Sequence, residues 1–161
     1  MGFFDAFGKK KGIVLGAPVD GECVPITEVS DPTFGDEILG KGVAIRPSNG
    51  VVCAPADGVV STAFPTGHAV AVTTTDGAEV LIHVGLDTVQ LNGKYFELKV
   101  AADQEVKKGD VLIVADIQKI QEEGYDIITP FVICNSSDFT DIEGITGNVV
   151  KTGDEVLRIK K

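Results

Sequence analysis

Apolar residues fall in short runs along most of the chain, and turn-forming residues separate these runs. From Ile13 onward the runs are rich in valine and isoleucine, while glycine, proline and aspartate stand between them. Short β-branched runs are typical of strands, because branched side chains pack well on a pleated surface. The pattern predicts an all-β fold with mostly antiparallel strands, a β-sandwich or barrel, that forms one domain over residues 13–161.

Two pairs of similar segments indicate an internal repeat. The sequence APVDG at Ala17–Gly21 returns as APADG at Ala54–Gly58, and VKKGD at Val106–Asp110 returns as VKTGD at Val150–Asp154. The Asp-Gly and Gly-Asp pairs are typical of tight turns between apolar runs. The repetition predicts two similar sheet motifs that pack face to face.

Few segments favour a helix. Residues 31–39 could hold one short helical turn, with Asp31 as the N-cap and Pro32 at the first helical position. A second short helix is predicted from Asp116 to Gly124, where the glycine would end it. The strands are therefore expected to dominate, with only short helical turns beside them.

The clearest hairpin signal lies between the only two histidines of the chain, His68 and His83. A largely apolar, β-branched run follows His68, and a second such run ends at His83. Between them stands Asp76-Gly77, a favoured dipeptide for a two-residue hairpin turn because both positions need a positive φ. The segment predicts two paired strands with one histidine near the open end of each.

The register of this hairpin decides whether the two rings meet. With Asp76-Gly77 as the turn, Thr75 pairs with Ala78 and His83 lies opposite Val70. His68 is then the diagonal neighbour of His83 on the same face, roughly 7–8 Å away at the backbone. A slip of one residue would place the rings on opposite faces of the sheet. This register therefore predicts a site made of two histidines.

Composition narrows the possible partners and compartments. The chain has 161 residues and a formal net charge of −10, so a phosphate backbone would repel it and nucleic acid is not an expected partner. The three cysteines, Cys23, Cys53 and Cys134, lack CxxC spacing, which favours a reducing compartment. The chain has no signal-peptide pattern, and no apolar run approaches the roughly 20 residues of a membrane span. A cytoplasmic location is expected.

The first residues differ from the rest. Phe3, Phe4 and Phe7 stand at helical spacing, and Lys9–Lys11 follow them. The simplest interpretation of residues 1–12 is a flexible, solvated tail. A short amphipathic anchor with a basic flank is the alternative.

Three chemistries fit a histidine pair. One imidazole could be the nucleophile of a phosphoryl transfer, and the other could hold the charged group by a hydrogen bond. Alternatively the pair could bind zinc, with Asp87 or a residue of a partner as a further ligand. General acid–base catalysis is the third option, which lacks support from any glycine-rich phosphate loop. At the open ends of the hairpin, Thr66 could orient one ring and Asp87 could support the charge balance.

Apolar residues near the hairpin could form a partly exposed rim around the histidines. An apolar patch around polar groups is typical of a protein-docking face, although each of these residues could equally belong to the core. Such a face would mean that another protein carries the substrate. The candidates for this rim are Phe34, Ile38, Leu39, Phe64 and Leu81.

Seven stretches of the chain form a recognisable set: APVDGECVPI, DPTFGDEILGKGVAI, VCAPADGVVSTAF, TGHAVAV, EVLIHVGLDTV, VKKGD and ITPFVICN. Taken together, they resemble the glucose-type IIA component of the bacterial phosphoenolpyruvate-dependent sugar phosphotransferase system. The resemblance covers nearly the whole chain from Ile13, and LIHVGLDTV with the upstream TGHA is its most specific part. An antiparallel β-sandwich is the fold that it implies.

The resemblance implies a role for each residue of the site. His83 would be phosphorylated on Nε2, His68 would stabilise the phosphoryl group, Thr66 would hydrogen-bond within the site, and Asp87 would flank it. Val89 joins the apolar docking rim. The implied donor is the phosphocarrier HPr, and the implied acceptor is a cysteine on the IIB domain of a sugar permease. No cofactor is required, although zinc shared by His68 and His83 at a partner interface is a further expectation.

Two other interpretations stay open. The segment around Lys119 resembles the hairpin of biotinyl and lipoyl carrier domains, but the usual tripeptide around the modified lysine is absent and the chain is about twice as long as such a domain. The chain could also be a docking module without catalysis, in which the histidines only contact partners. Regulated transporters or kinases would be such partners, and membrane contact would come only through a permease or the N-terminal tail.

Overall fold

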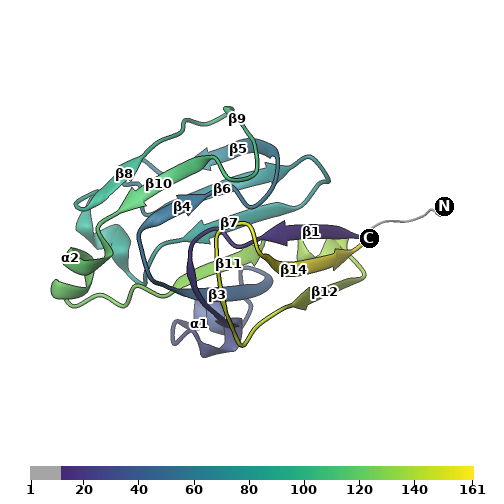
Figure 1. The fold of residues 1–161 in the computed structure, drawn as a ribbon, viewed down its shortest axis with the longest axis horizontal. Coiled ribbons are helices and arrows are strands. Elements are labelled where there is room, and N and C mark those ends of the chain that lie inside the picture. The colour runs from purple at the N-terminus through teal and green to yellow at the C-terminus, as the bar shows by residue number, and fades with distance from the viewer. Residues whose placement is uncertain (1–11) are drawn as a thin grey trace.

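Antiparallel strands are the main regular elements of the computed structural model, which describes residues 12–161 (Figure 1). The predicted N-terminal tail falls almost wholly outside these residues. The strands are Ile13–Gly16 (β1), Gly21–Pro25 (β2), Lys41–Pro47 (β3), Val51–Cys53 (β4), Gly58–Ala63 (β5), Ala69–Thr74 (β6), Glu79–His83 (β7), Phe96–Leu98 (β8), Glu105–Val106 (β9), Val111–Ala115 (β10), Thr129–Ile133 (β11), Asp141–Gly144 (β12), Asn148–Val150 (β13) and Glu155–Lys160 (β14).

Among the described residues, helix is limited to short pieces, as predicted. The α-helices are Pro32–Gly35 (α1) and Ile117–Glu122 (α2), and single 3₁₀ turns occur at Ile26–Glu28, Thr88–Leu91 and Ser136–Asp138. Within residues 12–161, no helix is long and apolar enough to cross a membrane.

Both predicted helix starts are confirmed by their caps. The Asp31 carboxylate accepts a hydrogen bond from the Thr33 amide at 3.0 Å, and the Asp116 carboxylate accepts one from the Lys119 amide at 3.2 Å. These bonds satisfy amide groups that have no partner within the first helical turn. The first helix, Pro32–Gly35, is the one short turn that residues 31–39 were predicted to hold.

Three sheets form the fold. The largest has eight strands in the order β13-β2-β3-β11-β7-β6-β5-β9, and two three-stranded sheets have the orders β1-β14-β12 and β4-β10-β8. The larger core contains alternate residues of the large sheet, such as Val43 and Ile45 of β3, while Ala44 between them joins a smaller cluster on the other face. This smaller cluster consists of Val24, Ile26, Val29, Phe34, Ala44, Leu86, Ile128 and Val132, with Leu81 packed against it.

The two copies of the predicted repeat occupy equivalent places. The first APxDG segment links β1 of a small sheet to β2 of the large sheet, and the second links β4 to β5 in the same way. Each VKxGD segment returns the chain from the large sheet to a small one, between β9 and β10 or between β13 and β14. Each of the four motif copies therefore lies where the chain passes between a small sheet and the large sheet.

Matching hydrogen bonds hold these crossing points together. Asp20 accepts from the Thr152 amide at 2.7 Å, and Asp57 accepts from the Lys108 amide at 2.8 Å. Each of these pairs joins the aspartate of an APxDG segment to the third residue of a VKxGD segment. The internal repeat predicted from the sequence is therefore confirmed as a structural repeat.

The two APxDG segments also bond to each other. The Gly16 amide donates to the Pro55 carbonyl at 3.0 Å, and the Cys53 amide donates to the Pro18 carbonyl at 2.7 Å. In both bonds, the residue before one segment donates to the proline of the other segment. The two halves of the chain are thus related by an approximate twofold arrangement at this contact.

The predicted register of the histidine hairpin was wrong by one residue. The strands pair Val72 with Val80 and Ala69 with His83, so Ala69 rather than Val70 lies opposite His83. The loop has three residues, 75–77, because the Thr74 amide donates to the Ala78 carbonyl at 2.8 Å.

A three-residue loop ending in glycine competes with the two-residue turn expected for Asp-Gly. Here Gly77 takes a φ of 97°, and its amide donates to the Thr74 carbonyl at 2.9 Å. The Thr74 hydroxyl also accepts a hydrogen bond from the Ala78 amide at 3.0 Å, which stabilises the longer loop.

The two repeat aspartates provide a matched test of the crossing points. The Asp20 carboxylate accepts from the Thr152 amide, the Thr152 hydroxyl and the Asn49 side-chain amide, whereas a single donor, the Lys108 amide, reaches the Asp57 carboxylate. We expect Asp20→Ala to lower the free energy of unfolding by about 2–3 kcal/mol and Asp57→Ala by about 1 kcal/mol, because three donors lose their acceptor in the first variant and one donor loses it in the second. Urea denaturation of both variants would measure this, and equal losses would contradict the unequal bonding.

Candidate functional site

His83 lies at the end of β7, inside the large sheet between β11 and β6. Its Nδ1 is 2.7 Å from the carbonyl oxygen of Gly85. A carbonyl oxygen only accepts hydrogen bonds, so Nδ1 carries the proton in the neutral ring and Nε2 keeps its lone pair. Gly85 has a φ of 81°, a conformation that glycine adopts without strain, and this turn places its carbonyl beside the ring.

His68 precedes β6 and is almost completely buried, with 5% of its surface exposed. It follows Gly67, whose φ is 73°, and its Nδ1 is 2.5 Å from the Thr66 hydroxyl. The centroids of the His68 and His83 rings are 5.0 Å apart, with an angle of 80° between the ring planes.

The predicted proximity of the two histidines is therefore correct, but the predicted reason for it is not. In the observed register, strand alternation alone would direct His68 and His83 to opposite faces. His68 belongs to the turn before β6, where alternation no longer decides the direction of a side chain. The turn at Gly67 brings the rings together.

Aromatic rings flank both histidines. The centroid of Phe34 is 5.0 Å from that of His83, and the centroid of Phe64 is 5.5 Å from that of His68. Phe34 is only 4% exposed, so it supports the His83 ring from the smaller core cluster instead of offering a surface to a partner. Phe64 is half-buried.

The other residues of the predicted docking rim differ in exposure. Ile38 is 70% exposed, Val89 is 49% exposed and Leu39 is 38% exposed, so these three present apolar surface to solvent. Leu81 is half-buried against the smaller cluster. Ile38, Leu39 and Val89 therefore have the exposure that a docking rim requires, whereas Phe34 does not.

Burial keeps both histidines neutral. The pKa of His68 is lowered to about 4, first by burial and then by the neighbouring charge of His83. Burial also lowers the pKa of His83, against the opposing effects of its bond to Gly85 and the carboxylates of Asp31 and Asp87. Near pH 7 both rings are therefore unprotonated at one nitrogen.

Two residues of this site were missed by sequence reasoning. Asp31 was identified only as a helix cap, yet its carboxylate acts on His83. The Gly85 carbonyl was not considered, since a backbone acceptor leaves no signature in residue type. Asp87 was predicted to flank the site, and its charge acts on His83. The backbone of Asp87 has a φ of 61°.

The described residues hold no group of three or more His, Cys, Asp or Glu side chains arranged around a potential metal ion. His68 and His83 are therefore the pair that could contribute to a metal site here, and a stable zinc site would need further ligands.

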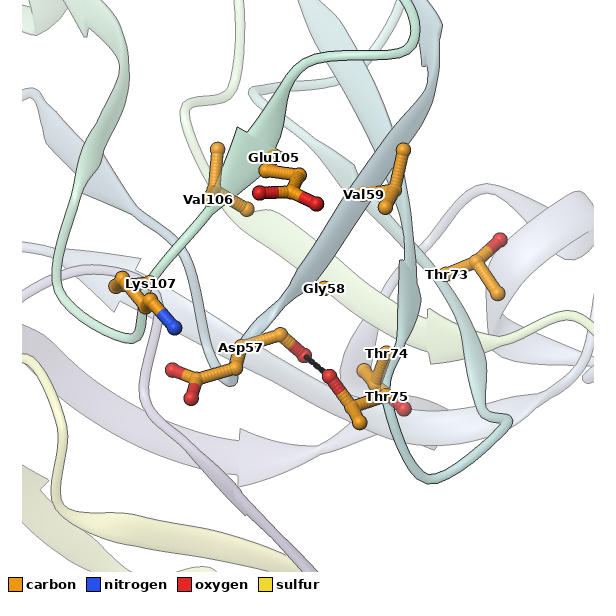
Figure 2. A pocket seen from close by; sticks show the side chains of 9 residues that line it. All are labelled: Asp57, Gly58, Val59, Thr73, Thr74, Thr75, Glu105, Val106 and Lys107. Atoms are coloured by element: carbon orange, nitrogen blue, oxygen red, sulfur yellow. Dashed lines mark hydrogen bonds between the residues drawn. The ribbon is translucent and has the colours of Figure 1, made fainter.

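A hollow of about 550 Å³ opens on another part of the surface, where β5, β6 and β9 adjoin (Figure 2). The Thr75 hydroxyl donates to the Asp57 carbonyl at 3.3 Å at its edge. None of the residues predicted for the histidine site lines this hollow, whose lining is Asp57, Gly58, Val59, Thr73, Thr74, Thr75, Glu105, Val106 and Lys107.

The fold matches a solved structure over nearly its whole length. Glucose permease IIA from Mycoplasma capricolum superposes with a TM-score of 0.87 and 38% sequence identity, covering 98% of this chain and 99% of that one. The antiparallel β-sandwich that the sequence predicts is therefore confirmed.

Sequence relatives include separate proteins and parts of longer ones. The glucose-specific EIIA component of Oceanobacillus iheyensis is 41% identical over 150 residues, which cover 92% of this chain and 91% of that protein. The beta-glucoside-specific EIIBCA component of Dickeya chrysanthemi is 43% identical over 143 residues, which are 89% of this chain. The match spans only 23% of that longer relative.

A family model assigns the chain directly. The model for the EIIA 1 component of the phosphoenolpyruvate-dependent sugar phosphotransferase system matches residues 13–139, which include both histidines and the whole repeat up to the last VKxGD segment. The resemblance identified from the sequence motifs is confirmed by this match and by the relatives. The chain therefore belongs to the EIIA 1 family of the phosphoenolpyruvate-dependent sugar phosphotransferase system.

Proposed function

We propose that this chain is a phosphoryl carrier, which accepts a phosphoryl group from phospho-HPr on His83 and passes it to a cysteine on the IIB domain of a glucose-type sugar permease. The observation that carries the proposal is the hydrogen bond of His83 Nδ1 to the Gly85 carbonyl at 2.7 Å. This bond leaves Nε2 with an unprotonated lone pair next to the second histidine, as a nucleophile requires. Membership in the EIIA 1 family supports the same role.

The relay has two steps, and in each step one bond to phosphorus forms while another breaks. His83 Nε2 attacks the phosphorus of phospho-HPr, the new P–N bond forms, and the P–N bond to the donor histidine breaks with its electron pair returning to the donor. In the second step, a cysteine thiolate attacks the same phosphorus, and the P–N bond to His83 breaks. The histidine returns to its starting state, so the chain acts as a relay.

His68 would hold the phosphoryl group during both steps. If the Thr66 hydroxyl donates to His68 Nδ1, the proton of the neutral His68 ring lies on Nε2 and is free to donate to a phosphoryl oxygen. A well-placed donor of this kind typically lowers a transfer barrier by a few kcal/mol. The low pKa of His68 favours this neutral donor over a fixed cation, which would hold the group too tightly for onward transfer.

The flanking carboxylates influence which partners can bind near His83. Asp31 and Asp87 place negative charge near His83, and the bound phosphoryl group adds about −1.5 to −2 charges. A partner that brings cationic side chains to this place would offset the repulsion while it is bound. Ile38, Leu39 and Val89 would supply the apolar contacts of a brief interface, below roughly 1,200 Å² in total.

The remaining parts of the proposal concern location and regulation. We place the chain in the cytoplasm, where HPr and a IIB domain would meet it, and assign membrane contact to the permease or to the N-terminal tail. Phosphorylation changes the charge at the centre of the docking face, so partners such as transporters or kinases could distinguish the two forms. No cofactor is required, and zinc would join His68 and His83 only where a partner completes the ligand set.

Incubation with phosphoenolpyruvate, enzyme I and HPr tests the proposed nucleophile. Intact mass under alkaline conditions should show an addition of about 80 Da on the wild type and none on His83→Ala. Wild-type protein without an adduct would favour the docking module, and an adduct on His83→Ala would place the nucleophile elsewhere.

The division of labour between the histidines predicts a different result for His68→Gln. This variant should still accept the phosphoryl group, because His83 keeps its lone pair. Onward transfer to the IIB domain should slow by about 10²-fold, as expected for the loss of one preorganised donor. Rapid-quench measurement of both steps separates them, and a variant unable to accept any phosphoryl group would refute this assignment.

The low pKa of His68 predicts a pH dependence of stability. An unfolded histidine titrates near about 6.5, so below that pH the unfolded chain binds a proton that the folded chain, with a pKa of about 4, does not. The free energy of unfolding should therefore fall with the pH, by about 2 kcal/mol between about pH 7.5 and 5 on account of His68. Urea denaturation across this range should show a smaller decline for His68→Gln, and identical slopes would contradict the lowered pKa.

A further inference from the structure

The segment Asn92–Phe96 packs directly behind the turn that carries His68. A Cβ atom added to Gly67 would lie 3.0 Å from the Cβ of Phe96, closer than side chains normally approach. On the other side, a Cβ atom added to Gly93 would lie 3.6 Å from the Thr66 carbonyl oxygen. The two backbones are therefore in van der Waals contact, and a shift of this segment would move Thr66.

This segment has an unusual backbone. Asn92, Gly93 and Tyr95 have φ values of 53°, 90° and 76°. Asparagine and glycine adopt positive φ readily, but a bulky aromatic residue does so rarely and at the expense of stability. A tyrosine in this conformation needs surrounding contacts that hold it there.

The residues just before and just after helix α2 supply those contacts. The Tyr95 hydroxyl donates to Glu123 Oε2 at 2.8 Å, and Lys94 Nζ donates to the same oxygen at 3.1 Å. At the other end of the helix, the Asp116 amide donates to the Tyr95 carbonyl at 2.9 Å. The bond to Tyr95, followed by that to Lys94, lowers the pKa of Glu123, which keeps the carboxylate charged. Residues at both ends of α2 therefore hold the segment in place.

We infer that Tyr95 and Glu123 are positioning residues for His68, acting through the segment Asn92–Phe96 and the Thr66–Gly67 turn. In this proposal neither Tyr95 nor Glu123 touches the phosphoryl group or a partner. Their bond holds the strained segment against the turn, and the turn holds the Thr66 hydroxyl at His68 Nδ1. The consequence for transfer rests on the proposed phosphoryl-carrier function, whereas the effect on the His68 ring does not.

Two variants break this bond without touching the histidine pair. Tyr95→Phe removes only the hydroxyl donor and keeps the ring, and Glu123→Ala removes the acceptor. Glu97→Ala is the matched control, because it breaks an exposed ion pair with Lys99 at 2.8 Å on the following strand, β8. Phenylalanine keeps the half-buried ring of Tyr95 packed against the core, and alanine is compatible with a folded chain at the exposed position 123. Circular dichroism would verify that each variant folds.

The first measurement is the titration of both histidines by NMR on the unphosphorylated protein. In Tyr95→Phe and Glu123→Ala, the His68 pKa should rise from about 4 toward its ordinary value by about half a unit or more, because a looser turn admits water to the ring. The His83 pKa should change less, since Gly85 holds that ring from a different turn. An unchanged His68 titration in both variants, equal to that of Glu97→Ala, would overturn the inference.

The second measurement is phosphoryl transfer from the chain to the IIB domain. Both variants should show a kcat lowered by about threefold with KM unchanged, because the docking rim is not altered, while Glu97→Ala should match the wild type. A change in KM alone would overturn a positioning role. Failure of the wild type to accept phosphoryl groups would refute the carrier function, but the NMR titration would still decide whether Tyr95 and Glu123 position His68.

Discussion

The paired backbone hydrogen bonds between the two APxDG segments are the constraint on which the architecture depends. Gly16 bonds to Pro55 and Cys53 bonds to Pro18, at the places where the chain passes from the small sheets to the large one. These hydrogen bonds join the two copies of the repeat at the places where the small sheets meet the large sheet. Within the large sheet, pairing with β11 and β6 positions β7, and hence His83 at its end.

The repeat could be predicted from the sequence because its signals are local. Each motif carries its own turn residues, and the aspartate of one motif finds an amide in the other at the equivalent place in both halves. The hairpin register was a harder problem. Asp76-Gly77 suits loops of two or three residues, and the choice rests on the bonds that Thr74 makes with Ala78 and Gly77 once the strands are paired. Residue types alone do not distinguish these loops.

The site likewise combines residues that are close in the sequence with residues that are distant in it. His68, His83 and Thr66 lie on one hairpin and the turn before it, so a short stretch of sequence was enough to associate them. Phe34 and Asp31 lie in the segment that connects β2 to β3, and they reach His83 because a single strand, β11, stands between β3 and β7 in the sheet. Their roles as a buried support and a nearby charge follow from sheet order, which the local pattern does not contain.

The two ends of the described chain meet in a single pair of strands. In that pair β1 runs beside β14 (Figure 1), with Ile13 opposite Ile159, and none of the residues named in the histidine site belongs to either strand. A module joined to either end would thus be tethered at nearly the same point. The effective concentration at which such a module meets His83 would depend on the length of its linker and hardly on which end carries it. The order of modules along a fused chain is therefore free to vary without rebuilding the carrier.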